Sequence, residues 1–117
     1  MKRRGERPRK VGDQIQRELS QILRRELRDP RVGQVTLTTV DVSPDLAHAD
    51  VYFTCLAAEH APEAVRGLTA AAGFLRSRLA RRMRMQGVPQ LRFVYDETVA
   101  RADRIARLLD QLPRGQR

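Results

Sequence analysis

The sequence predicts an α+β domain in which helices cover one face of a three-stranded sheet. Three stretches alternate apolar and polar side chains or are rich in β-branched residues, which is typical of strands; they are residues 34–42, 48–56 and 90–95. Three others carry apolar side chains at helical spacing; they are residues 11–28, 62–86 and 97–112. The predicted order is α-β-β-α-kink-α-β with a C-terminal helix. A length of 117 residues supports one hydrophobic core and not two.

The chain is expected to begin with a flexible basic arm over residues 1–10, which are polar and contain Pro8. From Val11 an apolar stripe recurs at three- and four-residue steps as far as Leu27. Asp29 ends this first helix, because the residue before a proline is disfavoured in the helical region.

The next two strands predict an antiparallel hairpin, because Ser43-Pro44-Asp45 between them has the chemistry of a turn. The apolar residues of the first strand change parity, so a β-bulge near Thr38 and Thr39 is needed to bring them onto one face. The inward face of the second strand carries Ala49, Val51, Phe53 and Cys55.

A glycine interrupts the helical pattern between the second and third strands. Pro62 suits the first turn of this segment. Gly73 costs about 1 kcal/mol relative to alanine inside a helix, so it predicts either a sharp bend or a close approach of the backbone to a partner. Residues 97–112 form the last helix, whose apolar stripe is expected to cover the sheet, and 113–117 form a loose tail.

Basic residues are unevenly distributed along the chain, which carries 23 Lys and Arg against 14 Asp and Glu. Residues 64–95 contain seven Arg and no acid, whereas 29–63 contain six acids and one Arg. A solvated helix would ordinarily carry carboxylates at pairing distance. Their absence favours a surface for nucleic-acid phosphates over an ordinary polar face. The candidate contacts are Gly73, Arg76, Arg78, Arg81, Arg82 and Arg84, with Arg3, Arg4, Arg7, Arg9 and Lys10 of the arm.

The sequence lacks the residue patterns that metal binding, catalysis or a membrane span would require. His48 and His60 have no ligand partners at metal spacing, and the single Cys55 fits an inward strand face, so we expect no metal, no cofactor, no catalysis and no internal disulfide. A lone cysteine fits the reducing cytoplasm. No run approaches the ~18 apolar residues that a membrane span requires, and residues 1–10 lack the apolar region of a secretory signal.

Five segments form a recognisable pattern through their order and spacing. They are RP at 7–8, RELRDPRVG at 25–33, VSPDLAHADVYFT at 42–54, AAGFLRSRLARRM at 71–83 and VPQLRFVYDET at 88–98. Over residues 7–110 this pattern resembles the ribosome-binding factor A family of bacterial small-subunit assembly factors.

The resemblance implies a type II K-homology (KH) fold, here a single RNA-binding domain over residues 11–112. It also implies binding to the free 30S subunit and its 16S rRNA, help in late maturation and processing of that rRNA, release before translation, and a role in cold adaptation. Ala71 and Gly73 match the family's Ala-x-Gly kink, which replaces the GxxG loop of other K-homology domains. The single-strand clamp of that loop is therefore not carried over unchanged.

The predicted protein is a monomeric, non-catalytic RNA-binding factor. Three alternatives remain: a module that docks on a ribosomal protein or an assembly GTPase through the acidic middle segment, a small RNA-modifying or RNA-cleaving enzyme, and a basic membrane-surface protein.

Overall fold

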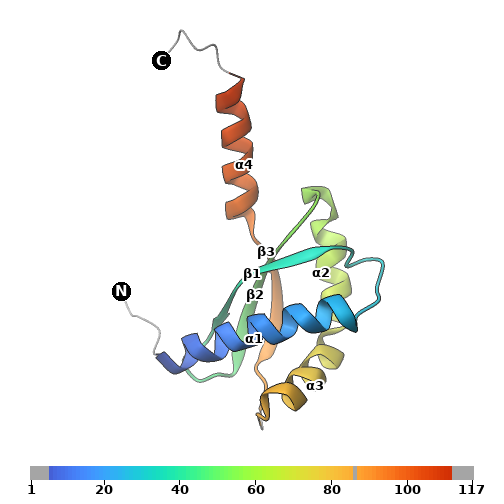
Figure 1. Ribbon diagram of the computed structural model, residues 1–117, viewed down its shortest axis with the longest axis vertical. Coiled ribbons are helices and arrows are strands. Elements are labelled where there is room, and N and C mark those ends of the chain that lie inside the picture. Colours follow the sequence, from blue (N-terminus) through green and yellow to red (C-terminus); the bar gives the residue numbers. More distant parts are fainter. Residues whose placement is uncertain (1–5, 86, 112–117) are drawn as a thin grey trace.

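The computed structural model describes residues 6–85 and 87–111 and confirms the predicted α+β order (Figure 1). Its elements are α1 (Glu6–Arg25), β1 (Val35–Val42), β2 (His48–Cys55), the 3₁₀ turn η1 (Ala58–His60), α2 (Ala61–Ala70), α3 (Ala72–Met83), β3 (Gln90–Tyr95) and α4 (Glu97–Asp110).

The strands form one sheet in the order β1-β2-β3. β1 and β2 pair antiparallel, as the hairpin predicted, and the predicted bulge lies between Leu37 and Thr39. β3 runs parallel to β2, with Phe93 beside Val51, because the two-helix connection carries the chain back across the sheet. The bulge lets Leu37 and Val40 both face the core.

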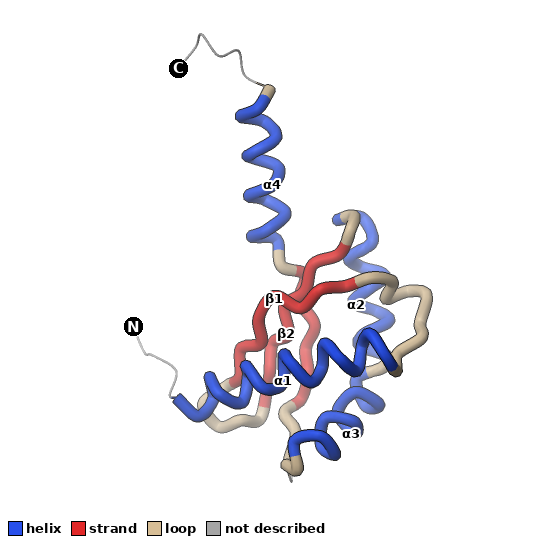
Figure 2. The backbone as a smooth tube through the Cα atoms, viewed as in Figure 1, coloured by secondary structure: helices blue, strands red, loops and turns tan. Residues whose placement is uncertain are grey.

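One face of the sheet is covered by α1, α2 and α3, and the three helices and this face share a single hydrophobic cluster (Figure 2). The helices contribute Ile15, Leu19, Ile22, Ala64, Leu68, Leu75 and Leu79, and the strands contribute Leu37, Val40, Val42, Ala49, Val51, Phe53 and Phe93. Each large side chain buried in this way contributes about 1.5–3 kcal/mol. α1 lies close on β1, since a Cβ at Gly12 would stand 2.5 Å from the carbonyl oxygen of Val40.

The first helix begins at Glu6, so the prediction of a flexible arm over residues 1–10 is wrong for residues 6–10. Pro8 is tolerated there because it lies in the first turn, where backbone N–H groups have no intrahelical partner, and its ring is buried. Arg3 and Arg4 lie outside the described residues. The helix ends at Arg25, before the expected Asp29, because the N–H groups of residues 26 and 27 both bond to the Ile22 carbonyl.

The bend between α2 and α3 falls at Ala71, within the predicted Ala71–Gly73 kink but two residues before the glycine. Ala71 has φ −88° and ψ 0° and donates its N–H to the carbonyls of Gly67 and Leu68. This conformation requires no glycine. Gly73 lies inside α3, which ends at Met83 with Arg84 in the left-handed region at φ 53°.

Helix α4 does not cover the sheet, which corrects the prediction for its apolar stripe. It points away from the body of the domain (Figure 1). Ile105, Leu108 and Leu109 are more than half exposed. Its first turn is held to the sheet by Asp96, whose carboxylate accepts a hydrogen bond from the Thr38 hydroxyl at 2.6 Å and one from the N–H of Thr98.

Candidate nucleic-acid interface

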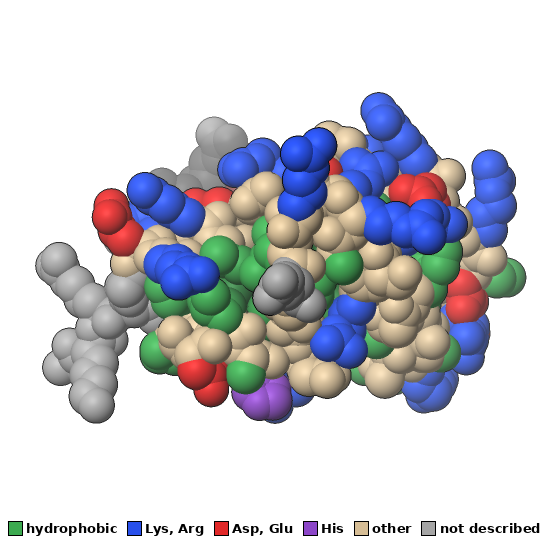
Figure 3. All heavy atoms as spheres, turned by 90° about the horizontal axis from the view of Figure 1, so that it is seen from below, with side chains coloured by type: hydrophobic (Ala, Val, Ile, Leu, Met, Phe, Trp, Pro, Cys, Tyr) green, Lys and Arg blue, Asp and Glu red, His purple; other side chains and the backbone are tan. Residues whose placement is uncertain are grey.

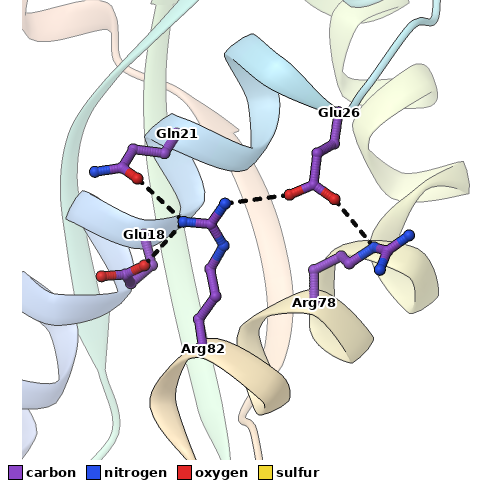
Figure 4. Close-up of polar contacts among 5 residues, drawn as sticks. All are labelled: Glu18, Gln21, Glu26, Arg78 and Arg82. Carbon is purple, nitrogen blue, oxygen red and sulfur yellow. Dashed lines mark hydrogen bonds and ion pairs between the residues drawn. The ribbon is translucent and has the colours of Figure 1, made fainter.

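Arg82 of α3 is held by two side chains of α1 and by Glu26, the residue that follows α1 (Figure 4). One guanidinium nitrogen donates to Glu18 at 3.1 Å and to Gln21 at 3.0 Å, and the other donates to Glu26 at 3.2 Å. The hydrogen bond to Glu18 is the main reason that the pKa of Arg82 lies above its ordinary value. Arg82 therefore fastens α3 to α1.

Arg78, one turn earlier, joins the same network. Its Nε lies 3.2 Å from Glu26 Oε1, so Glu26 bridges two arginines. Its guanidinium carbon lies 5.0 Å from the centroid of the Phe74 ring, which is cation–π distance. The group is held from two directions while its side chain stays 38% exposed.

Arg76 is also used internally. Its Nε donates to the Pro89 carbonyl at 3.1 Å and its Nη2 to the Val88 carbonyl at 2.9 Å. These two bonds tie α3 to the chain immediately before β3. Arg76 is a structural residue that satisfies two loop carbonyls.

The expectation that the arginines of α3 lack carboxylate partners is therefore wrong for Arg78 and Arg82. Their acids are Glu18 of α1 and Glu26 just after it, at least 52 residues away in the sequence. Spacing within one helix cannot reveal such pairs.

Arg81 and Arg84 remain free. Both are exposed, and neither makes a hydrogen bond or ion pair with another described residue. Arg81 lies on the side of α3 away from the buried Leu75 and Leu79, as its spacing predicted, whereas Arg84 caps the end of the helix in the left-handed conformation.

A second cationic stripe, missed in the sequence, runs along the solvent face of α1. Lys10, Arg17 and Arg24 are spaced by seven residues, which places them on one side of the helix, opposite Ile15 and Leu19. All three are exposed and unpaired within the described residues. The seven-residue spacing of these three residues is the signal in the sequence from which the stripe could have been predicted. The exposed basic residues beside the stripe are Arg7, Arg9, Arg25 and Arg28.

The stripe on α1 and the free end of α3 are neighbours. Gln21 lies between Arg17 and Arg24 on α1, and the three residues line a shallow hollow. The Gln21 side chain accepts a hydrogen bond from Arg82, the neighbour of Arg81 in the sequence. Seen from the end of the molecule where α3 lies, Lys and Arg side chains crowd the upper and right-hand parts of the surface (Figure 3). We call Lys10, Arg17, Arg24, Arg81 and Arg84 the cationic face.

The kink residues differ in their surroundings. Ala71 is half-buried against the core. Gly73 is exposed, and a Cβ built on it would meet nothing within 4 Å. The fold itself therefore does not require a glycine at this position.

Other chemistry finds little support. Burial raises the pKa of the Cys55 thiol, whose Sγ donates to the Ala57 carbonyl, so this group is no activated nucleophile. Among residues 6–85 and 87–111, no three His, Cys, Asp or Glu side chains are placed to share a metal ion. No helix in the same ranges is long and apolar enough to cross a membrane.

The model of the family described as ribosome-binding factor A matches residues 7–109. This chain belongs to that family. A ribosome-binding factor A from Thioalkalivibrio sulfidiphilus is 54% identical over 103 residues, which cover 87% of this chain and 80% of the relative. The match to the family includes all of α3 and all of α1 from Arg7 onward, and with them the whole cationic face.

Solved structures of the family have the same fold. The crystal structure of ribosome-binding factor A from Thermus thermophilus superposes with a TM-score of 0.68 at 32% identity, covering 75% of this chain and 93% of that one. A Thermus thermophilus homology model fitted into the cryo-EM map of a 30S–RbfA complex gives a TM-score of 0.63 at 33% identity, covering 73% and 90%. That relative has thus been placed on the 30S subunit.

Proposed function

We propose that this protein binds the free 30S subunit in the cytoplasm through 16S rRNA and assists late maturation of that rRNA without catalysis. Membership of the ribosome-binding factor A family and the 30S complex of a relative support the choice of partner. A net charge of +9 supports RNA as the component that is contacted.

The observation that carries the proposal is the division of the arginines into two groups. Arg76 and Arg82 satisfy groups within the fold, and Arg78 is partly engaged. The cationic face remains unpaired, although unpaired like charges on one surface repel each other. Phosphates remove that repulsion, and the guanidinium fork binds their oxygens in pairs.

The geometry suits the backbone of a folded RNA. Lys10 and Arg24 are 14 residues apart on one helix, which corresponds to about 21 Å along its axis. Phosphate contacts of this kind position a protein without reading the bases. The bound protein would hold a local rRNA fold until maturation is complete and would block premature use of that surface.

The acidic middle segment, residues 29–63, gives less support for a protein partner in the structure than its composition did in the sequence. Asp29 binds Arg31, Asp45 binds Ser43, and Asp50 binds Arg92. Because three of the six acids of residues 29–63 already have these partners, docking on a ribosomal protein or an assembly GTPase through this segment is the weaker alternative, although Glu59 and Glu63 are exposed.

The test removes three charges from the cationic face in the variant Arg17→Gln, Arg24→Gln, Arg81→Gln. Binding to 16S rRNA should weaken, and the slope of log K against log salt should fall by about two to three, since each phosphate contact contributes about 0.7–0.9. The variant should no longer sediment with free 30S subunits in a sucrose gradient.

A matched control removes three exposed, unpaired arginines elsewhere on the described surface, in the variant Arg66→Gln, Arg101→Gln, Arg107→Gln. The change in net charge is the same. If both variants lose binding equally, only overall charge matters and the assignment of the face is wrong. If neither loses binding, the partner is not held through these phosphate contacts.

A further inference from the structure

Phe74 is the most exposed of the five aromatic side chains in this chain, all of which are described. Phe53 and Phe93 are buried, Tyr95 packs edge-on against Phe53, and Tyr52 is half-buried on the sheet. Phe74 is 38% exposed. It is the third residue of α3, next to the buried Leu75, and points to the side of the helix away from the core.

The ring already has a cation on it. The Arg78 guanidinium carbon lies 5.0 Å from the ring centroid, and Arg78 is itself fixed by Glu26. This pair, which we call the Phe74–Arg78 platform, is therefore held in one arrangement before any partner arrives. Preorganised aromatic and guanidinium planes are the groups on which unpaired nucleobases stack.

The surroundings of the platform are open. Gly73 has no atom within 4 Å of the position of a Cβ, so a sugar–phosphate backbone has room beside the ring. Ser77 and Arg81 are exposed on the following turn, and Arg81 is unpaired within the described residues. A nucleotide at Phe74 would thus have a cation within reach of its phosphate.

We propose that the Phe74–Arg78 platform stacks one unpaired base of the bound RNA while Arg81 contacts the adjacent phosphate. This inference rests on the proposed function and adds that part of the RNA under α3 is single-stranded. Stacking does not depend on base identity, because every base has a π-face.

The chain contains no tryptophan, so Phe74→Trp introduces a single fluorescent reporter at the platform. The full-length variant is titrated with an eight-nucleotide oligoadenylate, with an abasic oligomer of the same number of phosphates, and with a duplex of the same length. The oligoadenylate should quench the fluorescence, whereas the abasic oligomer and the duplex should not. Equal quenching by the abasic oligomer would overturn the proposal.

A second measurement separates stacking from packing. Phe74→Leu keeps an apolar side chain but removes the π-face, and Phe74→Tyr keeps the ring. Phe74→Leu should weaken oligoadenylate binding roughly 5- to 150-fold, and Phe74→Tyr should bind as the parent chain does. Thermal unfolding checks that all three chains are folded.

The remaining outcomes have distinct meanings. If the parent and Phe74→Leu bind oligoadenylate equally and with the same steep salt dependence, RNA binding survives and the stacking proposal fails. If neither chain binds any RNA, the proposed function fails with it. If Phe74→Leu keeps RNA binding but loses the 30S subunit, the platform receives a protein side chain and the proposal is wrong.

Discussion

Replacing Gly73 by alanine tests whether this glycine serves the fold or a partner. The structure predicts a gain in stability, because Gly73 lies in a helix with no positive φ and a new Cβ would meet nothing within 4 Å. Removing glycine from a helix at a compatible conformation stabilises a protein by about 0.5–1 kcal/mol. For a domain of this size that raises the thermal midpoint by about 2–6 °C.

The same substitution is expected to weaken RNA binding. The Cβ occupies the space beside the Phe74–Arg78 platform through which a phosphate backbone would approach. Loss of one hydrogen bond to a charged group costs about 1.5–3 kcal/mol, or roughly ten-fold or more in affinity. Stability is measured by thermal unfolding, and affinity by titration of a 16S rRNA fragment at fixed salt.

Gly12→Ala provides the contrast, since its Cβ would stand 2.5 Å from the Val40 carbonyl oxygen and should destabilise the fold by about 1–3 kcal/mol. A Gly73→Ala chain that is more stable and binds RNA as tightly as the parent would refute the idea that the glycine leaves room for a partner. A Gly73→Ala chain that is less stable would refute the packing argument itself.

Two further predictions concern the side chains that hold the helices. Glu26→Gln should lower the free energy of unfolding modestly, because exposed ion pairs contribute little. It should also weaken RNA binding, because Arg78 of the Phe74–Arg78 platform loses the carboxylate that fixes it; unchanged or tighter RNA binding would show that Glu26 does not preorganise the platform. Asp96→Asn should reduce stability near pH 6, and this loss should become smaller as the pH falls below about 4. The Thr38 hydroxyl holds the pKa of Asp96 below its ordinary value. The contribution of the Asp96 carboxylate to stability is therefore complete above the pKa of an aspartate in the unfolded chain, near 4. It is lost as the pH falls through the lower pKa that Asp96 has in the folded protein. Thermal unfolding of the parent and of Asp96→Asn, from pH 6 downward, checks this prediction. A difference between the two thermal midpoints that does not change with pH would contradict it.

The strands and the bulge were predictable because they are recorded in local alternation. Only a shift of one residue near Thr38 brings Leu37 and Val40 to the same face, and the structure has that shift. The parallel pairing of β3 was not predicted, since strand orientation depends on the path of the connecting helices.

Helix α4 illustrates what periodicity leaves open. The stripe of Ile105, Leu108 and Leu109 looks the same in sequence whether or not it is packed. Where β3 ends, beside Thr38, the chain continues into α4 and leads away from the body of the domain (Figure 1). This direction leaves the apolar stripe of α4 exposed.

The cationic character of the candidate site was predictable from the run of basic residues without local acids, and its use for phosphates stays a prediction. The pairing of Arg82 with Glu18 could not be predicted, because it depends on how α1 crosses α3. The stripe of Lys10, Arg17 and Arg24 was assigned in part to an arm, because the first helix was expected to start at Val11.

If the protein binds rRNA as proposed, the bridge from Glu26 to Arg78 and Arg82 also bears on which polyanions it prefers. The bridge holds α3 against the end of α1, so the guanidinium groups stand at fixed separations. An RNA whose folded backbone matched those separations would bind without reshaping the protein, whereas a pliable polyanion of equal charge would first have to be ordered. A preference for tertiary shape would then follow from a contact that touches no nucleotide.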